Sequence, residues 1–253
     1  MSHRLERIPA AACTRAIALA LTVVLAGTAS PAQSGEFAVS PIRVDLKPGT
    51  LTETLTVSNH ARMPLRVSVK LKEWSQDPQG ADIYKDSDDL VYFPRQLDIP
   101  PQGRRLIRVG TRAPAVGTER AYRLFIEEEP APGSSAGAQV SFYFRFGVPI
   151  FLPPPTGRAQ PEVERIEFLP GKVQVRVRNP GSQHFRLLKV ALSGDSGYAK
   201  EVGGWYSLAG SSRIYSFDFP VADCLRTKAL RFTAEGEGVR LEEVVDVQPT
   251  SCR

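Results

Sequence analysis

The chain has 253 residues and a mass of 27.7 kDa, with 32 basic and 27 acidic side chains and a formal net charge of +5. Its 21 prolines and 20 glycines disfavour long helices, and a content of 42% hydrophobic and 23% charged residues excludes a disordered chain and a membrane bundle. The small basic surplus is spread along the chain without a Lys/Arg block, which argues against nucleic acid as a partner.

Residues 1–32 have the features of a secretory signal peptide. Three arginines precede an apolar run, AIALALTVVLA, over 16–26, and small residues follow it. The run is too short to span a bilayer, which needs about 20 apolar residues. A buried or anchoring helix is the alternative interpretation. We expect cleavage after Ala32, or after Ala29, followed by export without stable membrane insertion.

Alternation of apolar and polar residues with a period of two is the main signal in the rest of the chain. Leu65, Val67, Val69 and Leu71 are apolar, for example, and the residues between them are polar. Short strands separated by Pro and Gly turns are typical of antiparallel β-sandwiches. The strands predicted in chain order are 37–46, 51–59, 65–72, 90–93, 104–111, 122–128, 140–152, 173–178, 185–192, 213–219, 229–235 and 239–247.

A proline-rich linker, PPPTG at 153–157, divides this pattern in two. The segments before and after it, 33–152 and 158–253, each contain a strand, an Asn, a short turn and a second strand. Asn59 and Asn179 mark these equivalent corners. The predicted fold is therefore all-β, with two tandem immunoglobulin-like β-sandwich domains.

The sequence offers no competent active site. Gly-Asp-Ser-Gly around Ser196 matches the nucleophile tetrapeptide of trypsin-like proteases, but neither His60 nor His184 has the setting of their base. The tetrapeptide is typical of a turn between strands. Nucleotide-binding loops and metal-binding clusters are missing from the sequence. We expect a protein that is not an enzyme and has no cofactor or metal.

Two cysteines remain after removal of the signal peptide, Cys224 and Cys252. An even number of cysteines in an exported protein favours a disulfide. A metal site is the competing interpretation, but the chain lacks the close Cys/His spacing that such a site needs. We predict a Cys224–Cys252 bridge that ties down the C-terminus.

Six segments of the mature chain, taken together, carry a family resemblance. They are SPIRVDL, VSNHARMPLRVSVKLKEW, VYFPRQLDIPPQGRRLIRV, AYRLFIEEEP, VSFYFRFGVPIFLPP and VRNPGSQHFRLLKVAL. In this order they resemble the periplasmic pilus-assembly chaperones, the PapD-like family. The resemblance implies two immunoglobulin-like domains in a boomerang arrangement.

The resemblance also implies a function and a set of binding residues. Members of the family bind pilus or fimbrial subunits that lack their last strand, lend them a strand of their own, and deliver them to an outer-membrane usher. The implied donor residues are Val140, Phe142, Phe144 and Phe146, although an apolar row can equally pack into its own domain. Arg43 in SPIRVDL matches the residue that anchors the carboxylate at the C-terminus of the subunit.

One position departs from the family pattern. Pro149 stands where the family carries a lysine that also binds this carboxylate, and the nearest cation on the strand is Arg145. Arg43 then acts alone, another cation approaches, or the subunit is anchored differently. The alternative function for the whole chain is that of a structural pilus subunit or an adhesin.

Overall fold

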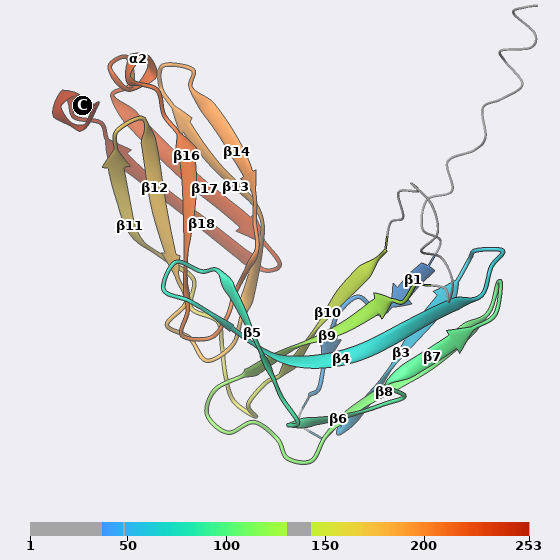
Figure 1. Ribbon diagram of the computed structural model, residues 1–253. Helices are drawn as coiled ribbons and strands as arrows, with labels where there is room; N and C mark the ends of the chain where they lie inside the picture. Colours follow the sequence, from blue (N-terminus) through green and yellow to red (C-terminus); the bar gives the residue numbers. More distant parts are fainter. Residues whose placement is uncertain (1–36, 48, 131–142, 253) are drawn as a thin grey trace, which may run out of the picture. The chain divides into compact units, whose positions relative to one another are not determined.

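The computed structural model describes residues 37–47, 49–130 and 143–252, and residues 37–253 form one compact unit (Figure 1). The predicted signal peptide at 1–32 lies outside the described residues, as do the predicted donor residues Val140 and Phe142. In the part of the chain that is described, no helix is long and apolar enough to cross a membrane.

The first sandwich consists of two sheets. One has the strand order β1-β3-β8-β6, and the other has the order β2-β10-β9-β4-β5, with β7 also paired to β4. The pairing is antiparallel except between β2 and β10, which run parallel. The strands are β1 (Phe37–Ser40), β2 (Val44–Asp45), β3 (Thr52–Asn59), β4 (Leu65–Gln76), β5 (Asp82–Asp86), β6 (Leu90–Phe93), β7 (Gln96–Ile99), β8 (Arg104–Thr111), β9 (Arg120–Glu128) and β10 (Arg145–Leu152).

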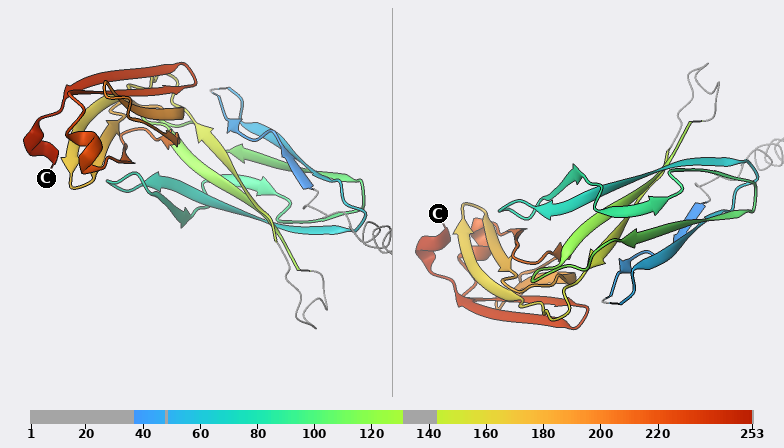
Figure 2. Two further views of the ribbon diagram at one scale, coloured as in Figure 1. Left: turned by 90° about the horizontal axis from the view of Figure 1, so that it is seen from above. Right: turned by 90° about the horizontal axis from the view of Figure 1, so that it is seen from below.

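The second sandwich has sheets of order β11-β12-β16 and β14-β13-β17-β18, with β15 also paired to β13. Figure 2 shows β11 and β12 (yellow) in one layer and β17 and β18 (red) in the other. Its elements are β11 (Glu162–Leu169), β12 (Lys172–Arg178), β13 (Phe185–Gly194), β14 (Ala199–Gly203), β15 (Tyr206–Ser207), β16 (Ser212–Asp218), α2 (Val221–Cys224), β17 (Ala229–Gly236), β18 (Val239–Asp246) and η1 (Pro249–Cys252).

The alternating residues form the cores as predicted. On β4 the apolar side chains at positions 65, 67, 69 and 71 are buried in the core of the first sandwich, and on β12 Val173, Val175 and Val177 are buried in the second. Each such side chain removed from water contributes about 1.5–3 kcal/mol. A third cluster combines residues of both sandwiches, with Trp74 and Phe151 packed against Tyr206.

The two predicted asparagine corners are confirmed as equivalent. The side-chain amide of Asn59 donates to the carbonyls of Met63, Ile99 and Pro100 at 2.8–3.1 Å, and its oxygen accepts from the amide of Ala61. Asn179 makes the same pattern of contacts in the second sandwich. Its amide donates at 2.8–3.1 Å to the carbonyls of Gln183, Ser207 and Leu208. Each buried asparagine thus satisfies three carbonyls where a strand ends and the chain turns.

Two predicted strands need correction, and five strands were not predicted. The strand expected over 37–46 is two short strands in different sheets, because Pro41 has no N–H with which to continue the ladder of β1. The strand expected over 140–152 is described only from residue 143, and β10 begins at Arg145. Strands β5, β7, β11, β14 and β15 have no counterpart in the predicted set. The boomerang arrangement and the domain limits at 33–152, 153–157 and 158–253 stay predictions.

The structure joins Cys224 and Cys252 by a disulfide, with a Cα–Cα distance of 5.6 Å. Both cysteines are buried in the second core, and the bond connects α2 to η1 near the C-terminus. The described residues contain no cluster of His, Cys, Asp and Glu that could hold a metal ion.

Candidate functional site

Strand β10 has one edge that is paired along its length and one that is open over most of it. On the first edge it pairs with β9 from end to end. On the second edge β2 pairs only with Ile150 and Phe151. No strand of the described chain covers this second edge over 145–149. The backbone there can therefore pair with a strand from another molecule.

Successive residues of β10 direct their backbone groups to opposite edges. The amide of Glu128 on β9 donates to the carbonyl oxygen of Phe144 (2.9 Å), so even-numbered residues bond toward β9. The carbonyl of Phe151 accepts from the amide of Leu46 (2.8 Å), so odd-numbered residues face the second edge. Pro149 belongs to the odd-numbered set, and its backbone faces the open edge, where a sheet tolerates proline.

The predicted donor face continues into the core of its own sandwich. The side chains of Phe144 and Phe146 are 38% and 36% exposed, and the ring of Phe146 lies 4.8 Å from that of Phe37 on β1. Further along the same face of β10, the side chains are buried in the first core; they are Val148, Ile150 and Leu152. The apolar row thus has a partly exposed end and a buried end. The exposed end suits the donor interpretation, and the buried end packs into the core of its own sandwich.

Arg43 lies in a cavity of about 390 Å³ at the end of this open edge. The switch of the chain between sheets at Pro41 places Arg43 directly before β2. Its Nε donates to Asp45 (3.1 Å) and its Nη1 donates to Glu237 (2.5 Å). The hydrogen bond from Arg43 lowers the pKa of the Glu237 carboxyl and raises the pKa of the guanidinium. The cavity lining also includes Arg123, Arg186, Pro149, Trp205 and Tyr206.

Arg123 is a second cation in this cavity that sequence reasoning missed. It lies on β9 directly opposite Pro149, and it is only 7% exposed. Its Nη1 donates to the carbonyl of Gly147 (2.7 Å), and its Cζ lies 4.1 Å from the ring of Trp74. Its Nε and Nη2 are buried and have no hydrogen-bond partner among the described residues. The positive charge of Arg123 is thus balanced by aromatic rings rather than by a carboxylate, and it adds to the positive potential of the cavity.

The sequence contained a signal for Arg123. It is the charged residue within the otherwise apolar run AYRLFI, all of which is buried in β9. A buried cation is costly unless it is paired, so this exception to the apolar pattern pointed to a partner. The third arginine of the cavity, Arg186 on β13, gave no such signal because alternation predicts a polar residue at its position.

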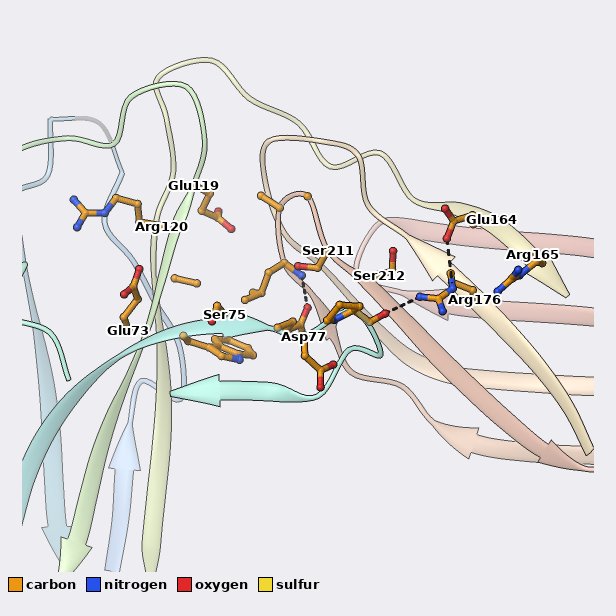
Figure 3. A pocket seen from close by; sticks show the side chains of 17 residues that line it. Glu73, Ser75, Asp77, Glu119, Arg120, Glu164, Arg165, Arg176, Ser211 and Ser212 are labelled. Carbon is orange, nitrogen blue, oxygen red and sulfur yellow. Dashed lines mark hydrogen bonds and ion pairs between the residues drawn. The ribbon is translucent and has the colours of Figure 1, made fainter. Parts of the chain in front are cut away.

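A larger cavity, of about 780 Å³, contains none of the predicted site residues (Figure 3). Its wall carries acidic and basic side chains, and Figure 3 shows Arg176 directed at Glu164. The Nε of Arg176 lies 3.6 Å from Glu164, and its Nη1 donates to the carbonyl of Pro78 (2.6 Å). Each arginine of this wall is paired with a carboxylate, Arg176 with Glu164, Arg165 with Glu167 and Arg120 with Asp89, whereas Arg123 in the smaller cavity has no carboxylate partner among the described residues.

Residues 36–157 match the family model described as "Pili and flagellar-assembly chaperone, PapD N-terminal domain". These residues, which include the whole first sandwich, belong to the PapD-like family of pilus-assembly chaperones. This confirms the resemblance drawn from the sequence motifs. No curated protein matches the chain in sequence.

Solved structures share the fold of this PapD-like chaperone at low sequence identity. A chain of the CsuC–CsuE chaperone–tip adhesion subunit complex of Acinetobacter baumannii is 17% identical with a TM-score of 0.60, over 82% of this chain and 97% of that one. A chain of the Salmonella enterica SafA pilin–SafB chaperone complex is 13% identical, with a TM-score of 0.57 over 84% and 98%. The Pseudomonas aeruginosa CupB2 chaperone is 21% identical, with a TM-score of 0.53 over 83% and 100%. These matches confirm the predicted all-β fold with two immunoglobulin-like domains.

In this PapD-like chaperone, Ser196 lies in the turn between β13 and β14. Its Oγ is 2.6 Å from the Oγ1 of Thr227, so its hydrogen-bond partner is another hydroxyl. His184 is engaged elsewhere, since its Nδ1 lies 2.7 Å from Glu119 and its ring stacks on that of Phe151. This geometry suits the turn interpretation of the Gly-Asp-Ser-Gly tetrapeptide, because a serine nucleophile needs a histidine beside it.

Proposed function

We propose that the mature chain is a periplasmic chaperone that binds a pilus or fimbrial subunit by donor-strand complementation and delivers it to the outer-membrane usher. The observation that carries this proposal is the open edge of β10, which presents exposed phenylalanines beside a cavity lined by arginines. An edge of this kind suits strand addition, in which backbone hydrogen bonds supply affinity and alternate side chains supply specificity.

The donor strand in this proposal consists of the segment that leads into β10. Phe144 and Phe146 are its described members, and Val140 and Phe142 continue the same alternation toward the N-terminus. A subunit that lacks its last strand has an open apolar groove, and these side chains fill it. Each one removed from water contributes about 1.5–3 kcal/mol, so a row of four holds a subunit without covalent chemistry.

The anchor for the subunit in this proposal is the cavity at the end of the open edge. Strand β10 runs toward this cavity, so a strand that pairs with it in parallel brings its C-terminal carboxylate there. Arg43 then binds the carboxylate through charge-assisted hydrogen bonds, and the positive charge of Arg123 in the same cavity attracts it. Arg123 supplies the cation that Pro149 cannot.

Capture of a subunit tests the proposal. The pilin-like product of a neighbouring reading frame is co-expressed with the chain, and the periplasmic complex is purified as a soluble one-to-one species. Arg43→Ala should lower the yield sharply, because it removes an anchor worth about 1.5–3 kcal/mol. Arg108→Ala on β8, an exposed arginine outside the cavity, is the control. Normal capture by Arg43→Ala contradicts the anchor, and self-polymerisation of the chain favours the structural subunit or adhesin.

A compensation experiment tests the role of Arg123. Arg123→Met keeps an unbranched side chain against Trp74 but removes the charge, so capture should fall. Adding Pro149→Lys to that variant places a cation on the facing position of β10 and should restore much of the capture. Unchanged capture by Arg123→Met, or failure of the lysine to restore capture in a double variant that melts like the single one, contradicts the role of the Arg123 charge.

The proposal includes export and two separable domains. N-terminal sequencing of protein from the periplasmic fraction should begin at residue 33, after removal of a signal peptide at 1–32. Limited proteolysis should cut within the linker at 153–157 and release fragments that correspond to 33–152 and 158–253. A mature chain that retains its first residues contradicts the export part of the proposal.

A further inference from the structure

Glu237 lies in the turn between β17 and β18, and its carboxylate reaches into the cavity that holds Arg43. The Nη1 of Arg43 donates to its Oε2 (2.5 Å), and the Nη1 of Arg186 lies 3.5 Å from its Oε1. The backbone amide of Glu237 donates to the carbonyl of Arg186 (3.2 Å). One carboxylate of the chain thus bridges two guanidinium groups of the cavity.

This arrangement places an acid on the same donors that the anchor offers a subunit. The Nε of Arg43 is already directed to Asp45 (3.1 Å), which leaves the Nη1 and Nη2 side of the guanidinium for a further carboxylate. A bidentate carboxylate needs two adjacent N–H groups on one side of the fork. Glu237 uses Nη1, so a second carboxylate cannot take the full fork while Glu237 remains.

The turn holds the backbone of Glu237 in place and leaves its side chain able to move. A side chain at Gly236 would clash with the carbonyl of Arg186, so the turn packs closely on β13. Gly238 has a φ of +69°, which closes the turn. The side chain of Glu237 is 44% exposed and carries rotatable bonds, so its carboxylate can swing to solvent without a change in the turn.

We propose that Glu237 is a built-in competitor that occupies Arg43 in the free chaperone and is displaced by the C-terminal carboxylate of the subunit. This inference rests on the proposed function. It adds a selection step: a ligand with a terminal carboxylate replaces the ion pairs that it breaks, whereas a ligand without one does not. Glu237 also keeps free anions from the cavity. The apparent affinity for a carboxylate falls in proportion to the fraction of chaperone molecules in which Glu237 occupies Arg43.

The test measures the binding of a defined peptide to the full mature chain. The probe is the hexapeptide acetyl-Thr-Val-Thr-Val-Thr-Tyr with a free C-terminal carboxylate, and its C-terminal amide is the matched reference. NMR titration of both peptides compares the wild type with Glu237→Gln and with Glu243→Gln, which removes the same charge from an exposed position on β18. Because Glu237 forms a partly exposed ion pair with Arg43, we expect its loss in Glu237→Gln to tighten binding of the free acid by about two- to fivefold. Binding of the amide should not change, and Glu243→Gln should behave as the wild type.

The outcomes separate this inference from the proposed function. If Glu237→Gln binds the acid no better, or binds it more weakly, while Arg43→Ala still abolishes the preference for acid over amide, the anchor is correct and Glu237 only positions Arg43. If acid and amide bind equally, or not at all, to both the wild type and Glu237→Gln, the carboxylate anchor itself is wrong. If Glu237→Gln tightens the binding of both peptides alike, the effect is not competition for the carboxylate and the inference fails.

Discussion

In the first sandwich, the last strand, β10, presents phenylalanines beside an open edge, whereas in the second the last strand, β18, presents charges at the edge of its sheet. Arg240, Glu242 and Glu243 are exposed on β18, and Glu242 pairs with Arg231 on β17. Charged side chains on an edge strand discourage pairing with another chain. The comparison teaches that the two halves share a fold and differ in the side chains that their last strands present, and the proposed strand addition depends on this difference.

The largest expected effect tests which face of the donor segment enters the groove of the subunit. Phe144→Glu should abolish subunit capture, because a carboxylate forced into an apolar groove without a partner costs several kcal/mol. Tyr143→Glu should be far milder, since neighbours along a strand point to opposite faces. Both side chains are more than a third exposed, so the melting temperature of the free chaperone should stay nearly unchanged. Co-purification and thermal melts measure the two effects, and equal damage to capture would show that the register is wrong.

The next prediction concerns the stability that the buried asparagine corner contributes to each sandwich. Asn59→Ala and Asn179→Ala should each destabilise their sandwich by about 3–4 kcal/mol, because each leaves several buried backbone groups without a partner. Urea denaturation, followed by tryptophan fluorescence and circular dichroism, gives the change in free energy of unfolding. A cost below 1 kcal/mol at either corner would mean that water replaces the amide there, and that the two corners are not energetically equivalent.

The disulfide distinguishes the second sandwich from the first. Exported protein should show Cys224 and Cys252 bonded, and non-reducing mass spectrometry that finds two free thiols contradicts this. The double variant Cys224→Ser/Cys252→Ser should lose about 3 kcal/mol of stability, because the bond closes a loop of 28 residues. The loss should appear in the unfolding of the second sandwich, while subunit capture by the first remains at low temperature.

The smallest effect is confined to high pH. Burial raises the pKa of Tyr198 in the second sandwich to about 12, and its hydroxyl donates to the carbonyl of Asp218 (2.6 Å). The folded pKa exceeds the unfolded value near 10, so this contribution to stability is complete below pH 10 and is lost as the pH rises toward 12. Tyr198→Phe should therefore flatten the decline in stability over that window, as chemical denaturation at several pH values would show. An unchanged decline would assign the loss to other groups, such as the buried Tyr122 of the first sandwich, whose pKa burial also raises.

Alternation predicted most of the strands that bury one face, although it missed the four-residue β7, and it failed for strands that bury little. Strands β6 and β8 have the predicted limits, and the side chains that they bury in the core include Leu90 on β6 and Ile107 and Val109 on β8. Strand β5, with the sequence DIYKD, is mostly exposed, and β14 likewise has no buried residue, so neither carries a period-two signal. Their place in a sheet depends on backbone pairing with β4 and β13, which sequence periodicity does not record.

The candidate site was predictable only where the family motif or the strand pattern includes it. Arg43 came from its position in SPIRVDL and the donor row from alternation. Arg123 and Glu237 reach the same cavity from β9 and from the turn after β17, which are 114 residues apart in the sequence (237 minus 123). Contacts over such a separation follow from tertiary packing, so no local pattern could assign them to one site.

Pro149 has a consequence for the solubility of the free chaperone. An exposed edge with apolar side chains invites a second copy to stack on it and begin a continuous ladder. Along β10, however, the position of Pro149 offers a carbonyl but no N–H, and β2 covers the residues after it. An incoming strand, whether from a second copy or from another protein, therefore meets an interruption of the ladder at Pro149. The residue that removes a cation from the family pattern also limits how far a second copy can extend a ladder along this edge, as prolines do on other edge strands.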